Sequence, residues 1–140
     1  MRVAEFLEDY AFSFGTGDME ALADFYDVPL SLIQPEGTML LHSREELVDH
    51  LVARHERYIA AGLARVKGSS VEEVGFDEGL GILNVRWELH GRSGSLITTI
   101  ATTYLLRQRD GILRIAGVVR LDQLAGGTAL NRRHQGSGRA

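Results

Sequence analysis

The stretch that decides the fold is SLITTIATTYLLRQRDGILRIAGVVRL, residues 95–121, because it places two long alternating segments around one tight turn. Asp110-Gly111 is typical of a type I′ hairpin turn, which needs positive φ at both central residues. A two-residue turn pairs Arg109 with Ile112, and the same register places Tyr104 opposite Gly117. The face predicted to be buried carries Ile100, Thr102, Tyr104, Leu106, Leu113, Ile115, Gly117, Val119 and Leu121, and the other face carries Thr99, Thr103, Arg107, Arg114, Val118 and Arg120.

Two further strands precede this hairpin, at about Val66–Phe76 and Gly81–His90, where the hydrophobic period is two. Val85 and Trp87 lie on the apolar side of the second strand, which we expect to face inward. A sheet of this size must bury one face, and helices are the only elements left to cover it. We expect the long strands to curl into a cone.

The N-terminal half predicts the covering helices. Apolar residues recur at helical spacing from Val3 to Phe14, and Asp18 is a good N-cap for a short second helix. Ser43 and Glu46 form a capping box that opens the longest helix, expected over residues 43–65. Its apolar stripe is predicted to comprise Leu47, Val48, Leu51, Val52, Tyr58, Ile59 and Leu63, with His55 at the middle and His50 on the opposite side.

Two short strands are expected between the helices, at Phe25–Ile33 and Met39–His42. Pro29 cannot donate to a ladder, so the first of them should be an edge strand or be bulged near its start. The order of elements predicts an α+β fold, in which a curved antiparallel sheet wraps around a long helix and an N-terminal helix pair. Residues 1–125 form this single domain, and residues 126–140 have the composition of a flexible tail.

Composition excludes several classes of function. The net charge of −4 gives no reason to expect nucleic acid, and no apolar run reaches the roughly 20 residues of a membrane helix. Cysteine is absent, so disulfides and thiolate chemistry are excluded, and we expect a cytoplasmic protein. The five histidines show no ligand spacing on one element, and no phosphate-binding loop follows a strand, so neither a metal nor a cofactor is expected.

The candidate site is a mostly apolar pocket inside the cone. His55 is either a core histidine or a pocket base, and Tyr10 is either a core ring or a hydrogen-bond donor in the pocket. The expected lining is Tyr10, Phe14, Tyr26, His55, Tyr58, Val85, Trp87, Thr102, Tyr104 and Val119, with Gln34 at the neighbouring turn. Such a lining favours a small apolar or aromatic ligand with one or two polar groups.

The chain resembles the nuclear-transport-factor-2-like superfamily over about residues 2–122. The resemblance rests on Gly15-Thr16-Gly17-Asp18, on Gln34-Pro35-Glu36-Gly37, on the capped long helix and on Asp110-Gly111, in this order. It implies a cystatin-like α+β cone. The superfamily includes ketosteroid isomerases, scytalone dehydratase and cyclases of the SnoaL kind, together with binding proteins, so it does not imply one function.

The isomerase pattern carries over only in part. Tyr10 stands where the isomerases have their catalytic tyrosine, but Gln34 stands where they have the general base. An amide cannot accept a proton at neutral pH, and no carboxylate lies on the strand that reads Thr102-Thr103-Tyr104, where the second acid is expected. The resemblance therefore does not favour isomerisation of the ketosteroid type.

Three hypotheses remain for the function. The first is small-molecule binding in the cone, and the second is a dehydratase or cyclase that uses His55 as base and Tyr10 or Tyr104 to polarise a carbonyl. The third is an interaction module with a filled cone. The outer sheet face is half apolar, which predicts a homodimer through that face.

Overall fold

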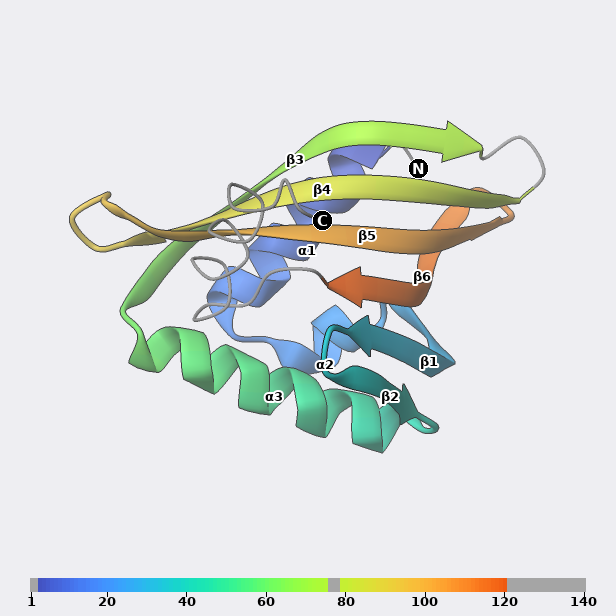
Figure 1. Cartoon of the computed structure of the whole chain (residues 1–140), viewed down its shortest axis with the longest axis horizontal. Coiled ribbons are helices and arrows are strands. Elements are labelled where there is room, and N and C mark those ends of the chain that lie inside the picture. The colour runs from blue at the N-terminus through green and yellow to red at the C-terminus, as the bar shows by residue number, and fades with distance from the viewer. Residues whose placement is uncertain (1–2, 76–78, 121–140) are drawn as a thin grey trace.

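The computed structural model describes residues 3–75 and 79–120 of the chain, and three helices pack against a six-stranded sheet (Figure 1). The long strands β4 and β5 pass in front of α1, and α3 runs below them beside β1 and β2. The elements are α1 Val3–Thr16, α2 Met19–Ala23, β1 Tyr26–Gln34, β2 Gly37–Leu41, α3 Arg44–Ala60, β3 Leu63–Gly75, β4 Leu80–Gly91, β5 Leu96–Arg109 and β6 Ile112–Arg120. The predicted α+β fold is confirmed. The predicted tail, residues 126–140, lies outside the described residues.

The sheet has the order β2-β1-β6-β5-β4-β3. Its neighbouring strands are antiparallel except β1 and β6, which run parallel, so the prediction of an antiparallel sheet omitted this pair. β1 is an internal strand, and the edges are β2 and β3. The exposed Pro29 lies where the β1–β6 register is interrupted, between Tyr26 and Ser31. The predicted irregularity near the start of this strand is therefore present, while the alternative of an edge strand is wrong.

The helix ends follow the capping signals in the sequence. Asp18 accepts a hydrogen bond from the amide of Ala21 at 3.0 Å, which opens α2. Ser43 accepts from the amide of Glu46 at 3.2 Å, and Glu46 accepts in turn from the amide of His42 at 2.7 Å. These bonds satisfy amides that the first turn of a helix leaves without partners, so both helices begin where the sequence predicts.

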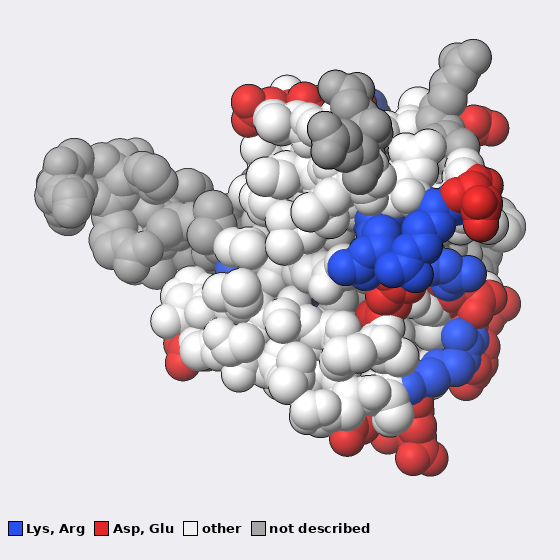
Figure 2. Space-filling view, turned by 90° about the vertical axis from the view of Figure 1, so that its right-hand side faces the viewer, with Lys and Arg blue, Asp and Glu red and all other residues white. Residues whose placement is uncertain are grey.

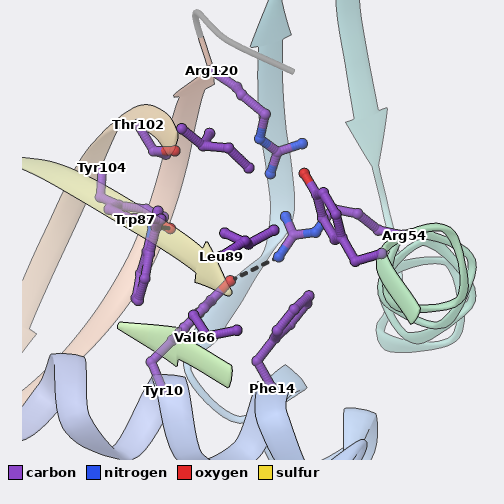
Figure 3. A pocket seen from close by; sticks show the side chains of 11 residues that line it. Tyr10, Phe14, Arg54, Val66, Trp87, Leu89, Thr102, Tyr104 and Arg120 are labelled. Carbon is purple, nitrogen blue, oxygen red and sulfur yellow. Dashed lines mark hydrogen bonds between the residues drawn. The ribbon is translucent and has the colours of Figure 1, made fainter. Parts of the chain in front are cut away.

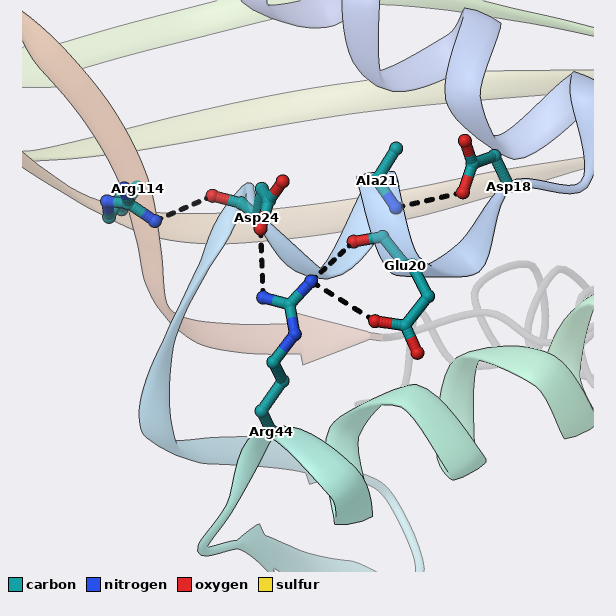
Figure 4. A network of polar contacts seen from close by, with 6 residues as sticks. All are labelled: Asp18, Glu20, Ala21, Asp24, Arg44 and Arg114. Carbon is teal, nitrogen blue, oxygen red and sulfur yellow. Dashed lines mark hydrogen bonds and ion pairs between the residues drawn. The ribbon is translucent and has the colours of Figure 1, made fainter.

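An exposed arginine ties α2 to α3 (Figure 4). Arg44 donates to a carboxylate oxygen of Asp24 at 2.8 Å and to the backbone oxygen of Glu20 at 2.7 Å. Because these side chains are exposed, the ion pairs contribute little to stability, and the contact mainly fixes how the two helices meet.

The β5–β6 hairpin begins in the predicted register and then shifts. Leu106 pairs with Ile115 as expected, but Leu105 pairs with Gly117, because Ala116 is an extra residue in β6. Every β6 residue after the bulge therefore lies on the opposite face from the predicted one. Val118 and Arg120 are buried at 2% and 7% exposure. The predicted inward positions of Gly117 and Val119 are wrong, as are the outward positions of Val118 and Arg120, and Leu121 lies outside the described residues.

The buried stripe of α3 is also rotated from the predicted one. Its buried residues are Leu47, Leu51, Arg54 and Tyr58, at spacings of four, three and four. Val52 and Ile59, which were predicted to face the core, are exposed at 38% and 49%. The predicted end of this helix at residue 65 is also wrong, because α3 ends at Ala60 and Leu63 is the first residue of β3. Hence the centre of the stripe lies near Arg54 rather than His55. No helix in the described parts of the chain is long and apolar enough to cross a membrane.

Candidate functional site

A small cavity lies inside the cone, between α1, α3 and the concave face of the sheet (Figure 3). Its volume is about 30 Å³, which is room for one or two water molecules. Nearly every side chain around it is less than 9% exposed, although the cavity itself is partly open. The lining residues are Tyr10, Phe14, Arg54, Tyr58, Val66, Trp87, Leu89, Ile100, Thr102, Tyr104 and Arg120.

Tyr10 is at the centre of the polar groups of this cavity. Its hydroxyl accepts a hydrogen bond from Arg54 Nη2 at 3.2 Å and shares one of 2.5 Å with the hydroxyl of Tyr26. The Tyr10 ring also packs against Trp87, with ring centroids 5.3 Å apart. On the sheet side, Trp87 Nε1 donates to the Tyr104 oxygen at 2.9 Å. The Tyr104 hydroxyl proton is therefore available for another acceptor.

The tyrosines differ in acidity because burial, nearby charge and hydrogen bonds balance differently at each of them. Burial acts to raise the pKa of Tyr10, but the charge of Arg54 and the hydrogen bonds from Tyr26 and Arg54 outweigh it, so the pKa of Tyr10 is lowered. Burial raises the pKa of Tyr26 and of Tyr104, and the adjacent Tyr10 raises both further. Tyr10 is thus the most acidic of the three phenols.

Arg54 and Arg120 bring two positive charges into the interior. Figure 3 shows Arg54 reaching in from α3 and Arg120 from the end of β6, with their guanidinium groups turned toward one another. Their exposed fractions are 8% and 7%. Among the described residues neither makes an ion pair, and Arg54 Nε has no hydrogen-bond partner. Burial, followed by repulsion from Arg54, lowers the pKa of Arg120.

Arg54 is partly compensated by its surroundings. Its guanidinium carbon lies 5.2 Å from the centroid of the Phe14 ring, within the range of a cation–π contact, and it donates to Tyr10. Arg120 has neither a cation–π contact nor a hydrogen bond of this kind among the described residues. Arg120 is therefore the less compensated of the two cations.

His50 lies close to this charge, one helical turn before Arg54. Burial is the main cause that lowers its pKa to about 4, and the charges of Arg54, Arg120 and Arg57 lower it further. Its Nε2 is buried without a hydrogen-bond partner among the described residues. The prediction that His50 points away from the core is wrong, because it lies at the margin of the buried stripe.

The structure brings together six of the predicted site residues around the cavity, namely Tyr10, Phe14, Tyr58, Trp87, Thr102 and Tyr104. The others lie elsewhere. Tyr26 is buried behind Tyr10, and Val85 is a core residue that does not line the cavity. Gln34 ends β1 at the turn into β2, and Val119 is on the outer face because of the bulge.

His55 lies beside the cavity without lining it. Its ring packs edge-on against Phe14, with centroids 5.2 Å apart, and its Nε2 is buried with no partner in the described chain. A general base needs a group that orients it and access to the substrate, and His55 has neither here. The geometry is that of a packed core histidine.

Sequence reasoning missed Arg54 and Arg120. Arg54 could have been found from helical spacing. Leu47, Leu51 and Tyr58 lie on one face of α3, and position 54 is the position between Leu51 and Tyr58 that faces the same way. Arg120 could not be placed without the bulge at Ala116, since strict alternation along β6 puts it on the outer face.

Carboxylates are absent from the lining of the cavity. Asp27 follows Tyr26 in β1 but does not reach the cavity. It forms an ion pair of 2.8 Å with Arg107, beside a surface hollow at the end of the β5–β6 hairpin. Figure 2, which shows this end of the molecule, has basic side chains lying beside acidic ones. Within residues 3–75 and 79–120, no group of His, Asp and Glu is arranged to hold a metal ion.

A family model described as an NTF2-like protein, DUF6841, matches residues 2–123. The chain belongs to this NTF2-like family. The match spans the whole of the described fold, so the resemblance expected from the sequence is confirmed. No functionally curated protein matches the chain.

Solved structures of similar fold have low sequence identity to this family member. An NTF2-like protein of unknown function from Shewanella oneidensis is 19% identical with a TM-score of 0.67, over 86% of this chain and 96% of that one. A cystatin-like domain of unknown function from Nostoc punctiforme is 15% identical with a TM-score of 0.68, over 96% and 88%. A ketosteroid isomerase-like protein from Erwinia carotovora is 16% identical with a TM-score of 0.59, over 85% and 92%. At such identities the likeness concerns the fold alone.

Proposed function

We propose that this NTF2-like protein binds a small molecule in the interior of its cone. The observation that supports the proposal is the composition of the cavity, where aromatic and aliphatic walls surround a few convergent polar groups. Apolar walls with a few well-placed polar groups are the usual composition of a ligand site. The proposal takes the cytoplasm as the compartment, following the expectation from the sequence.

The size of the cavity constrains the ligand. A volume of about 30 Å³ is far below the roughly 300–1,000 Å³ of pockets that hold drug-sized ligands. The ligand is therefore either very small or one whose binding moves the side chains that close the cone. The ligand predicted from the sequence, a small apolar or aromatic molecule with one or two polar groups, is proposed here with this condition added.

Binding is favoured over catalysis by the residues that line the cavity. A dehydratase or cyclase needs a base, and the described lining contains neither a histidine nor a carboxylate. Tyr10, whose pKa is lowered, could donate a proton or a hydrogen bond, so a polarising role remains part of the enzymatic alternative. His55 is not a candidate base in this arrangement.

Native mass spectrometry of the purified protein tests the proposal. We expect a carried-over adduct that disappears under denaturing conditions, and its mass would identify the ligand class. An adduct-free spectrum, together with no thermal stabilisation by any member of a small-metabolite panel, would contradict the proposal and leave the filled-cone interaction module as the better reading.

We also propose that the outer sheet face pairs with a second copy of the chain. Val74, Ile82 and Leu105 are neighbours in the β3, β4 and β5 registers, and they are exposed at 48%, 40% and 38%. They form a short apolar row across one end of this face, where burial against an identical row would remove apolar surface from water.

A further inference from the structure

We propose that the ligand of the cone is a small carboxylate, held between Arg54 and Arg120. The inference rests on the proposed binding function and adds the chemical class of the ligand. The argument starts from charge, because the cavity is bordered by two cations and by no anion among its lining residues.

Two guanidinium groups less than 9% exposed are costly for a fold to keep without a counter-charge. Arginine stays protonated inside proteins, so the site cannot escape this cost by losing a proton. The Phe14 ring and the Tyr10 hydroxyl compensate Arg54 in part. Even a fully ionised Tyr10 would neutralise only one of the two positive charges. At least one charge therefore has no counter-charge among residues 3–75 and 79–120, and a bound anion would supply it.

The directions of the donors fit one anion better than two separate ones. Arg54 and Arg120 come from different elements and turn toward the same space, as Figure 3 shows. A carboxylate has two oxygens with several acceptor positions, so each guanidinium can donate to a different oxygen. The free hydroxyl proton of Tyr104 adds a third donor on the sheet side.

The remaining walls favour an organic carboxylate over inorganic phosphate. Phe14, Val66, Leu89 and Ile100 are apolar and would contact the part of the ligand that bears no charge. A tetrahedral phosphate would bring oxygens against these walls, where they would find no donors. A planar carboxylate places its charge at the arginines and its hydrocarbon part against the apolar side.

Calorimetric titration with acetate and benzoate, against acetamide and benzamide as neutral isosteres at equal ionic strength, tests the inference. We expect the carboxylates to bind and the amides to bind at least tenfold more weakly, because the amides bring no charge to the arginines. Arg120→Met and Arg54→Met should each weaken carboxylate binding by about tenfold or more. Arg92→Met, at an exposed position in the β4–β5 turn, should leave it unchanged.

A second readout locates the site even if the Arg54 variant does not fold. NMR titration of His50 in the unmodified protein should show its pKa rising from about 4 when benzoate is bound, because a bound anion offsets the charges of Arg54 and Arg120. Carboxylate binding that leaves the His50 titration unchanged would overturn the inference and point to another surface, such as the open groove between α1 and β3.

The outcomes separate this inference from the proposed function. Equal affinity for amides and carboxylates, or a neutral carried-over ligand, would overturn the carboxylate assignment while binding in the cone stands. Phosphate binding with no carboxylate binding would also overturn it. If neither series binds and no ligand is carried over, the proposed function fails as well.

Discussion

Removing the charge of Arg120 should stabilise the ligand-free protein. Arg120→Met keeps a long unbranched apolar stem in the same space, so the packing contribution changes little. The substitution removes a guanidinium that is 7% exposed, has no ion-pair partner among the described residues and is repelled by Arg54. Replacing buried charged groups by apolar ones of similar volume is typically neutral to stabilising by about 1–4 kcal/mol.

We therefore expect a gain of about 1–3 kcal/mol in the free energy of unfolding. For a chain of this length, that corresponds to a Tm higher by about 3–9 °C. The assay is differential scanning calorimetry, with urea unfolding as a second measure, in a buffer whose only small anion is chloride. Arg120→Lys keeps the charge, so we expect it to give no such gain.

A saturating carboxylate should narrow the difference in stability. At a concentration of 100 times the wild-type Kd, the ligand adds about 2.7 kcal/mol to the wild type and only about 1.4 kcal/mol to a variant that binds it tenfold more weakly. A lower Tm for Arg120→Met without ligand, or equal effects of the Met and Lys substitutions, would refute the reasoning. Either result would mean that Arg120 has a compensating partner and is not kept for an external anion.

Three further predictions concern other parts of the fold. The pKa of His50 is lowered from 6.5 to about 4, so between these pH values the folded state binds fewer protons at this site than the unfolded state. The free energy of unfolding therefore falls as the pH falls from 6.5 to 4. In urea unfolding over this interval, His50→Gln should lose less stability than the wild type. Gly68→Ala places a Cβ as close as 2.4 Å to the Trp87 ring and should lower the free energy of unfolding by about 1–3 kcal/mol, measured by thermal unfolding. The control is Gly15→Ala, at a position in α1 where a Cβ meets no atom within 4 Å, and it should raise the free energy of unfolding by about 0.5–1 kcal/mol. Leu105→Glu puts a charge into the apolar row of the outer face and should convert a dimer to a monomer in light scattering, while a wild-type protein that is already monomeric would contradict the proposed dimer.

Much of the fold follows from local signals that act over a few residues. The Asp18 and Ser43 caps and the turn at Asp110-Gly111 each satisfy a backbone requirement within their own segment, so the sequence predicts them without knowledge of neighbours. The alternation along β4 is similarly local, and Val85 and Trp87 are buried as expected. The parallel pairing of β1 with β6 has no such signal, because it joins segments far apart in the chain.

The sequence by itself determined the α+β cone, the starts of its two capped helices and the aromatic character of the interior, because periodicity and capping are properties of short segments. Only the tertiary structure decided which polar groups enter the cavity. One extra residue in β6 moves Val119 out and Arg120 in, and a small rotation of α3 replaces His55 by Arg54. Side-chain direction in a strand reverses with each residue, so a single bulge that depends on pairing across the sheet changes the chemistry of the site.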